Sequence, residues 1–132
     1  MTINLRAAMT THPHSIRLDE TVQMARHKMA EFDVRHLPVL AAGELRGVVS
    51  DRDLKLVRGD GHDVSVEDVC VDDPIAVDVD TSLFIVTGLM VDTRAGSVLV
   101  TEEGKLVGIF TTTDACRVLT TLLDHRRDGA AQ

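Results

Sequence analysis

One pattern occurs twice in this chain, as Gly43-Glu-Leu-Arg-Gly-Val-Val-Ser-Asp-Arg-Asp53 and, 61 residues later, as Gly104-Lys-Leu-Val-Gly-Ile-Phe-Thr-Thr-Thr-Asp114. Around it, residues 4–57 align with residues 65–118 without a gap. The matches fall at turn glycines, at apolar strand positions and at one hydroxyl–carboxylate pair, so a structural unit is repeated. Two units predict two equivalent clefts, which favours ligand binding over a single catalytic centre.

Length and composition limit the possible functions. With 132 residues the chain is long enough for one domain, and each half is marginal alone, so we expect the halves to share apolar faces. The net charge of −7 argues against binding to a nucleic-acid backbone. The first residues show no apolar stretch of signal-peptide length, no window approaches the length of a membrane span, and the two cysteines lack a metal-binding spacing. These features predict a soluble, cytoplasmic protein that binds neither nucleic acid nor membrane.

Each repeat predicts the same order of elements. A short capped helical turn comes first, followed by a short strand, a longer helix, a hairpin of two strands and a second helix. In the first repeat these elements are 5–9, 15–18, a helix from 22, strands 37–40 and 45–49, and a helix from Ser50 to about Gly59. The second repeat predicts 66–70, 76–79, a helix from 83, strands 98–100 and 106–110, and a helix from Thr111 that stops at Gly129. The predicted boundaries are 4–58 and 65–123 for the repeats, 59–64 for a linker and 124–132 for a tail.

The last helix carries an apolar stripe at helical spacing, formed by Ala115, Val118, Leu119, Leu122 and Leu123. We expect this stripe to belong to the core, and a dimer contact is the alternative.

The repeated motif Gly-h-h-[Ser/Thr]-x-x-Asp, in which h is apolar, has two possible roles. A strand that turns into a helix presents free backbone N–H groups to a phosphate, and a carboxylate one turn later can accept both hydroxyls of a ribose diol. The glycine allows a ligand or another backbone to approach closely. The same spacing also describes a helix capping box, in which the hydroxyl and the acid satisfy backbone N–H groups. The residues alone leave both roles open.

These units resemble a tandem CBS-domain module, a pair often called a Bateman module. The resemblance rests on Val34-Arg-His-Leu-Pro-Val39, on the turn at Gly43, on the run from Leu45 to Asp53 and on the duplicated motif. It covers residues 4 to about 123. It implies an α/β (α+β) fold of two β-α-β-β-α units, packed sheet to sheet with pseudo-two-fold symmetry and with clefts between them.

The resemblance also implies a function. Such modules sense adenosine compounds and have no catalysis of their own, so AMP, ADP or ATP is the expected ligand, and no cofactor is required. S-adenosylmethionine, NAD-type compounds and cyclic dinucleotides are alternatives, and so is a structural or partner-docking protein with vestigial clefts. The resemblance further implies a homodimer and a regulated partner protein that the sequence does not identify.

Mapped by motif, the resemblance assigns site residues in both repeats. Asp53 and Asp114 would hold ribose hydroxyls, and Ser50 and Thr111 would contact ribose or phosphate. The base would lie in an aliphatic slot between the first strand and the strand that follows the long helix. The implied ligand-binding residues are His14, Ile16, Arg35, His36, Leu37, Pro38, Ser50, Arg52 and Asp53 in the first repeat, and Ile75, Val77, Ser97, Val98, Thr111, Thr113 and Asp114 in the second.

The two predicted clefts differ in charge. The first repeat has basic residues around its motif, namely Arg35, His36, Arg52 and Lys55 with His12 and His14, whereas the second has Asp72 and Asp73 at the expected cleft mouth and Ala95-Gly96-Ser97 in place of Arg-His. We therefore expect a phosphorylated ligand to fill the first cleft. The six histidines match no metal-binding motif, and neither a metal site nor a catalytic residue is predicted.

Overall fold

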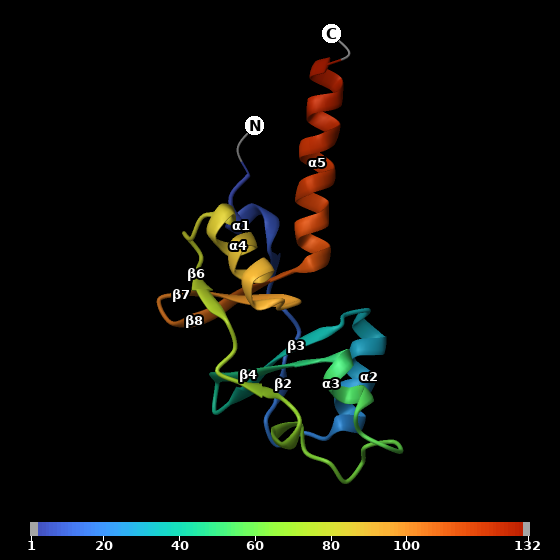
Figure 1. The fold of residues 1–132 in the computed structure, drawn as a ribbon. Coiled ribbons are helices and arrows are strands. Elements are labelled where there is room, and N and C mark those ends of the chain that lie inside the picture. Colours follow the sequence, from blue (N-terminus) through green and yellow to red (C-terminus); the bar gives the residue numbers. More distant parts are fainter. Residues whose placement is uncertain (1–2, 131–132) are drawn as a thin grey trace. The chain divides into compact units, whose positions relative to one another are not determined.

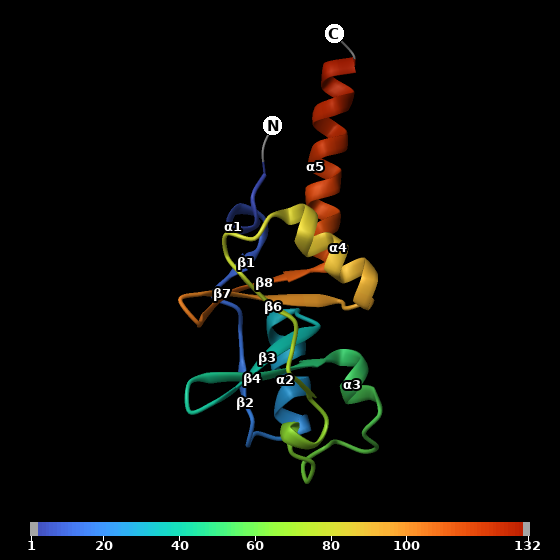
Figure 2. The same ribbon diagram turned by 60° about the vertical axis from the view of Figure 1, so that its left-hand side comes forward.

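A computed structural model describes residues 3–130, which form two compact units (Figures 1 and 2). One unit comprises residues 13–74, and the other joins the N-terminal segment up to His12 to the chain from Ile75 onward. Among residues 3–130, no helix has both the length and the apolar character that a membrane crossing requires.

The unit of residues 13–74 is a four-stranded sheet with helices. Its elements are β2 (Ile16–Arg17), α2 (Val22–Phe32), β3 (His36–Ala41), β4 (Glu44–Ser50), α3 (Asp51–Lys55), the 3-10 helix η1 (Val66–Asp68) and β5 (Val71–Asp72). The strand order is β2-β3-β4-β5, with β2 and β3 parallel and the other neighbours antiparallel. Val22, Ala25 and Met29 of α2 pack with Leu37, Val39 and Val49 of the sheet to form its core.

The other unit repeats this arrangement. It contains α1 (Leu5–Ala8), β1 (Thr10–Thr11), β6 (Ala76–Asp78), α4 (Leu83–Thr93), β7 (Ser97–Glu102), β8 (Lys105–Thr111) and α5 (Thr112–Ala130). The strand order is β1-β8-β7-β6, again with one parallel pair, β6 with β7. The predicted fold class, an α+β pair of related units, is confirmed.

The backbone repeats more faithfully than the sequence. His36 pairs with Ser50 and Ser97 pairs with Thr111, and both hairpins shift register at the matched positions Val39/Leu40 and Val100/Thr101. Positive φ angles recur at four positions 61 residues apart, His12/Asp73, Asp33/Arg94, Ala42/Glu103 and Gly43/Gly104. Because the residue types differ at three of these four pairs, the turn geometry is imposed by the surrounding fold.

Each compact unit contains the first segment of the other sequence repeat, so the first segments are exchanged between the repeats. β1, from the start of the first repeat, pairs with β8 of the second, and β5, from the start of the second, pairs with β4 of the first. Leu5 and Met9 are buried in the core of the unit that contains β8, whereas Val66 is buried in the core of residues 13–74. Each sequence repeat therefore completes the other's hydrophobic core.

The motif glycines make this exchange possible. A Cβ atom added to Gly47 would lie 2.5 Å from the carbonyl oxygen of Val71, and one added to Gly108 would collide with the side chain of Met9. The sequence left open whether a ligand or a backbone approaches these glycines. In the structure, the incoming segments β5 and β1 occupy this space.

Some helix ends differ from the prediction. α3 ends at Lys55, short of the predicted end near Gly59, because the Arg26 guanidinium binds the carbonyl oxygens of Leu54 at 2.8 Å, Val57 at 2.7 Å and Gly59 at 2.6 Å. α5 continues through the predicted stop at Gly129 to Ala130, since a glycine inside a helix costs only about 1 kcal/mol.

The apolar stripe on α5 is only partly core. Ala115 and Val118 pack against the buried cluster, but Leu119, Leu122 and Leu123 are exposed. The prediction that the whole stripe is buried was wrong because α5 extends past the sheet that it packs on (Figure 1).

We predict that Gly47→Ala destabilises the protein by about 1–3 kcal/mol, because the new methyl group would push β5 away from β4. Gly88→Ala is the matched control: Gly88 lies inside α4 with open space at its Cβ position, so the change should stabilise the helix by up to about 1 kcal/mol. Urea unfolding of both variants measures the difference, and equal stabilities would contradict the close-approach role.

Candidate functional site

The first motif forms a complete capping box at the junction of β4 and α3. The Ser50 backbone N–H donates to Oδ2 of Asp53 at 2.9 Å, and the Asp53 backbone N–H donates to the Ser50 hydroxyl at 3.1 Å. Among the described residues, no hydrogen bond reaches Oδ1 of Asp53, and the residue is half-buried. The capping role is thus real, and one carboxylate oxygen is left over.

Main-chain contacts bring the predicted strand residues next to this box. His36 is the cross-strand partner of Ser50, and the Asp51 N–H donates to the Arg35 carbonyl oxygen at 2.9 Å. The side chains of Arg35 and Arg52 are exposed, and His36 is half-buried. The structure therefore gathers the predicted residues Arg35, His36, Ser50 and Asp53, with Arg52 on the first turn of α3.

The surroundings of His36, beside the capping box, shift the pKa of its ring. Burial of the ring lowers its pKa below the ordinary value of about 6.5, and the charges of Arg35 and Arg52 act in the same direction. Asp51 and Asp53 partly oppose this by raising the pKa. The ring is accordingly neutral at pH 7, although it stands among charged groups.

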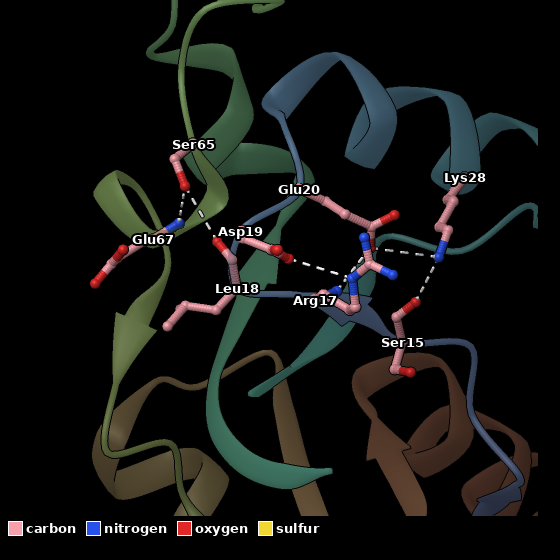
Figure 3. A network of polar contacts seen from close by, with 8 residues as sticks. All are labelled: Ser15, Arg17, Leu18, Asp19, Glu20, Lys28, Ser65 and Glu67. Atoms are coloured by element: carbon pink, nitrogen blue, oxygen red, sulfur yellow. Dashed lines mark hydrogen bonds and ion pairs between the residues drawn. The ribbon is translucent and has the colours of Figure 1, made fainter. Parts of the chain in front are cut away.

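A polar network surrounds the start of β2 (Figure 3). Lys28 Nζ donates to the Ser15 carbonyl oxygen at 3.0 Å and lies 3.8 Å from the Glu20 carboxylate, which accepts the Arg17 N–H at 2.7 Å. This network fixes the backbone between His14 and Arg17. The Lys28 and Glu20 side chains are only 28% and 19% exposed, so their ion pair is partly shielded from solvent.

An aromatic pair at the same edge was missed from the sequence. The ring of His14, a predicted site residue, stacks on the ring of Phe32 with centroids 3.6 Å apart and planes 7° from parallel. Phe32 is the last residue of α2 and His14 precedes β2. Only the tertiary fold brings these two residues together, since no local sequence pattern pairs residues 14 and 32.

Several predicted site residues lie in the cores. Ile16, Leu37 and Val98 are fully buried there and Pro38 is also buried, so these four residues present little or no surface to a ligand. Ile75, Val77 and Ser97 are half-buried, and Thr113 is exposed on the first turn of α5.

The second motif forms the same box with additional partners. The Thr111 N–H donates to Oδ2 of Asp114 at 2.9 Å, and the Asp114 N–H donates to the Thr111 hydroxyl at 3.3 Å. Oδ1 of Asp114 accepts from the Arg117 guanidinium at 3.1 Å and from the Thr10 hydroxyl at 3.4 Å. Asp114 is buried, unlike Asp53. Sequence analysis overlooked Thr10 and Arg117, although their repeat partners are identifiable as Val71 and Leu56.

The predicted charge contrast needs a correction. Asp72 belongs to β5, which pairs with β4, so Asp72 and Asp73 belong to the unit that contains Asp53 and not to the unit that contains the second motif. His12, expected beside the first motif, lies in the other unit. Both errors follow from the exchange of the first segments.

Two surface hollows lie away from the motifs. One, of about 210 Å³, is lined by Leu18, Arg46, Glu67, Asp72 and Asp73. The other, of about 270 Å³, is lined by Ile3, Asn4, Arg6, Val79, Asp80, Thr81, Ser82 and Leu83. Neither hollow is lined by a predicted ligand-binding residue. Within residues 3–130, no three metal-ligating side chains gather closely enough to hold a metal ion.

Comparison with known proteins identifies the repeats. The family model described as "CBS domain" matches residues 5–59 and again residues 66–121. The CBS domain-containing protein YhcV of Bacillus subtilis (strain 168) is 26% identical over 109 residues, which cover 80% of this chain and 78% of YhcV.

Solved structures agree with the fold. An uncharacterized conserved protein from Pyrococcus horikoshii is 32% identical with a TM-score of 0.80, and the alignment covers 89% of this chain and 92% of that one. CBSX2, solved in complex with AMP, is 26% identical with a TM-score of 0.78, covering 92% of this chain and 98% of CBSX2.

The lowered pKa of His36 predicts a pH-dependent stability. Between the native and unfolded pKa values the unfolded chain binds more protons, so the contribution of His36 is present above about pH 6.5 and is lost as the pH falls below it. Replacing His36→Gln should therefore reduce the loss of stability between pH 7.5 and pH 5.5, measured by urea unfolding at each pH.

His62→Gln is the matched control, because the hydrogen bond to Asp60 raises the pKa of His62 and its contribution has the opposite sign. An unchanged pH slope in the His36→Gln variant would contradict the assignment.

Proposed function

This chain belongs to the CBS-domain family as a tandem pair of CBS domains, and on that premise we propose that it is a regulatory module that binds an adenosine compound without catalysing a reaction. The proposed ligand is an adenine nucleotide, AMP, ADP or ATP, and the proposed location is the cytoplasm. The AMP complex of CBSX2, which is 26% identical to this chain, supports this ligand class.

One observation carries the proposal. Asp53 stands on the first turn of α3, directly after β4, with Oδ2 committed to the Ser50 N–H and without a described hydrogen bond to Oδ1. An ionised carboxylate with one such oxygen is a suitable acceptor for a ribose hydroxyl. Ser50, His36 and Arg35 surround it through the strand pairing and the Asp51 N–H contact.

The charges near Asp53 suit a phosphate. Arg35 and Arg52 are exposed cations close to the capping box, and a guanidinium can bind two phosphate oxygens at once. A phosphate there would also favour protonation of His36, whose pKa burial keeps low in the free protein. We propose that Arg35, His36 and Arg52 read the phosphate while Asp53 reads the ribose.

The decisive variant is Asp53→Asn. The asparagine oxygen can still cap Ser50, so melting without ligand should change little, but the charged acceptor for the diol is lost. The affinity for the best adenine nucleotide should fall by roughly tenfold, or about 1.4 kcal/mol, in calorimetric titration. Unchanged binding would leave Asp53 as a helix cap only, and a protein that no adenine nucleotide stabilises against melting would favour a docking protein with vestigial clefts.

We also expect a homodimer at micromolar concentration. The unit that contains α4 and α5 exposes large apolar side chains, among them Phe84 with 87% of its surface exposed and Leu123 with 58%. A contact between two copies would remove part of this apolar surface from water. Sedimentation equilibrium should give twice the chain mass of 14.4 kDa, and a single-chain mass across that concentration range would contradict the expectation.

A further inference from the structure

The two repeats present the same acid in different surroundings. Matched through the 61-residue repeat, Asp53 and Asp114 both accept the N–H of the residue that opens their helix. Arg117 and Thr10 contact Asp114, whereas the matched positions in the unit of Asp53 hold Leu56 and Val71. Leu56 and Val71 are both exposed, and neither can donate a side-chain hydrogen bond. The difference falls on the oxygen that capping leaves over.

In the second repeat that oxygen is already used. Oδ1 of Asp114 accepts from Arg117 at 3.1 Å and from Thr10 at 3.4 Å, and only 4% of the Asp114 side chain is exposed. A ribose diol would have to displace a charged donor and enter a covered position. At Asp53 neither cost arises, because the Leu56 side chain has no donor that could bind Oδ1 of Asp53.

We propose that the Arg117 guanidinium, supported by the Thr10 hydroxyl, occupies the Asp114 oxygen that a ribose diol would need. Each chain then binds one nucleoside, at Asp53. This inference rests on the proposed function and adds the residue that sets its stoichiometry. Arg117 is itself 73% exposed, so its removal opens the acid without emptying a core position. Thr10 is carried by β1, which pairs with β8 next to the start of α5 (Figure 2).

The repeat supplies its own test. Arg117→Leu gives the second repeat the residue that the first has at the matched position, and Thr10→Val with Arg117→Leu completes the exchange. Leu56→Arg makes the opposite change near Asp53. Calorimetric titration with adenosine, which lacks phosphate, isolates the diol, and a parallel titration with AMP detects any phosphate contact by Arg117. Arg126→Leu, on an exposed part of the same helix, controls for the loss of a positive charge.

We expect about one adenosine per chain for the wild type and for Arg126→Leu. Arg117→Leu should add a second equivalent that binds within about tenfold of the first, and Leu56→Arg should weaken the single site by about fivefold or more. The inference alone would be overturned if the wild type, Arg117→Leu and the double variant each bind one adenosine, provided that the melting curve shows the double variant to be folded. Weaker AMP binding in Arg117→Leu would likewise overturn it, because Arg117 would then read phosphate. Absence of adenosine and AMP binding in the wild type and in every variant would overturn the proposed function as well.

Discussion

The hydrogen bond from a strand-end N–H to a carboxylate three residues later organises both halves of this protein. At Ser50 and again at Thr111 it ends a strand, starts a helix and aims an acid at the same place in the fold. The bond satisfies a helix-end N–H group that would otherwise lack a partner, which is why the hydroxyl–acid spacing is kept in both repeats. Capping uses one oxygen of the acid, so the surroundings of the second oxygen decide whether the site can hold anything else.

The exchange of first segments makes these surroundings unequal. Thr10 reaches Asp114 because β1 lies against β8, and Val71 takes the matched position because β5 lies against β4. The first sequence repeat thus supplies a hydroxyl to the acid of the second, whereas the second repeat places only an apolar residue at the matched position. Gly47 and Gly108 permit the close approach of β5 and β1 that this exchange requires. The motif glycines therefore stabilise the fold, and they affect the site only because the fold positions it.

Sequence alone predicted the repeating helices, hairpins and caps because each has a local cause. Thr21 and Ser82 open helices through their own side chains, and Gly43 and Gly104 turn the hairpins with positive φ. The strands β1 and β5 have two residues each, too few to show an alternation of apolar and polar side chains. The exchange of first segments that depends on them could therefore not be predicted from the sequence. The positions of Asp72, Asp73 and His12 were wrong for that reason. The end of α3 depends on Arg26, a contact 28 residues distant in sequence, and the partners of Asp114 depend on a contact over 104 residues.

Central to the proposed function is that Asp53 has an oxygen available to a ribose diol and Asp114 does not. Nuclear magnetic resonance tests it directly, by following the backbone amide signals of Ser50 and Thr111, whose N–H groups donate to these two acids, during titration with adenosine. The account predicts that the Ser50 signal shifts in a saturable manner while the Thr111 signal stays in place. Equal saturable shifts of both signals, or a shift of Thr111 alone, would contradict it.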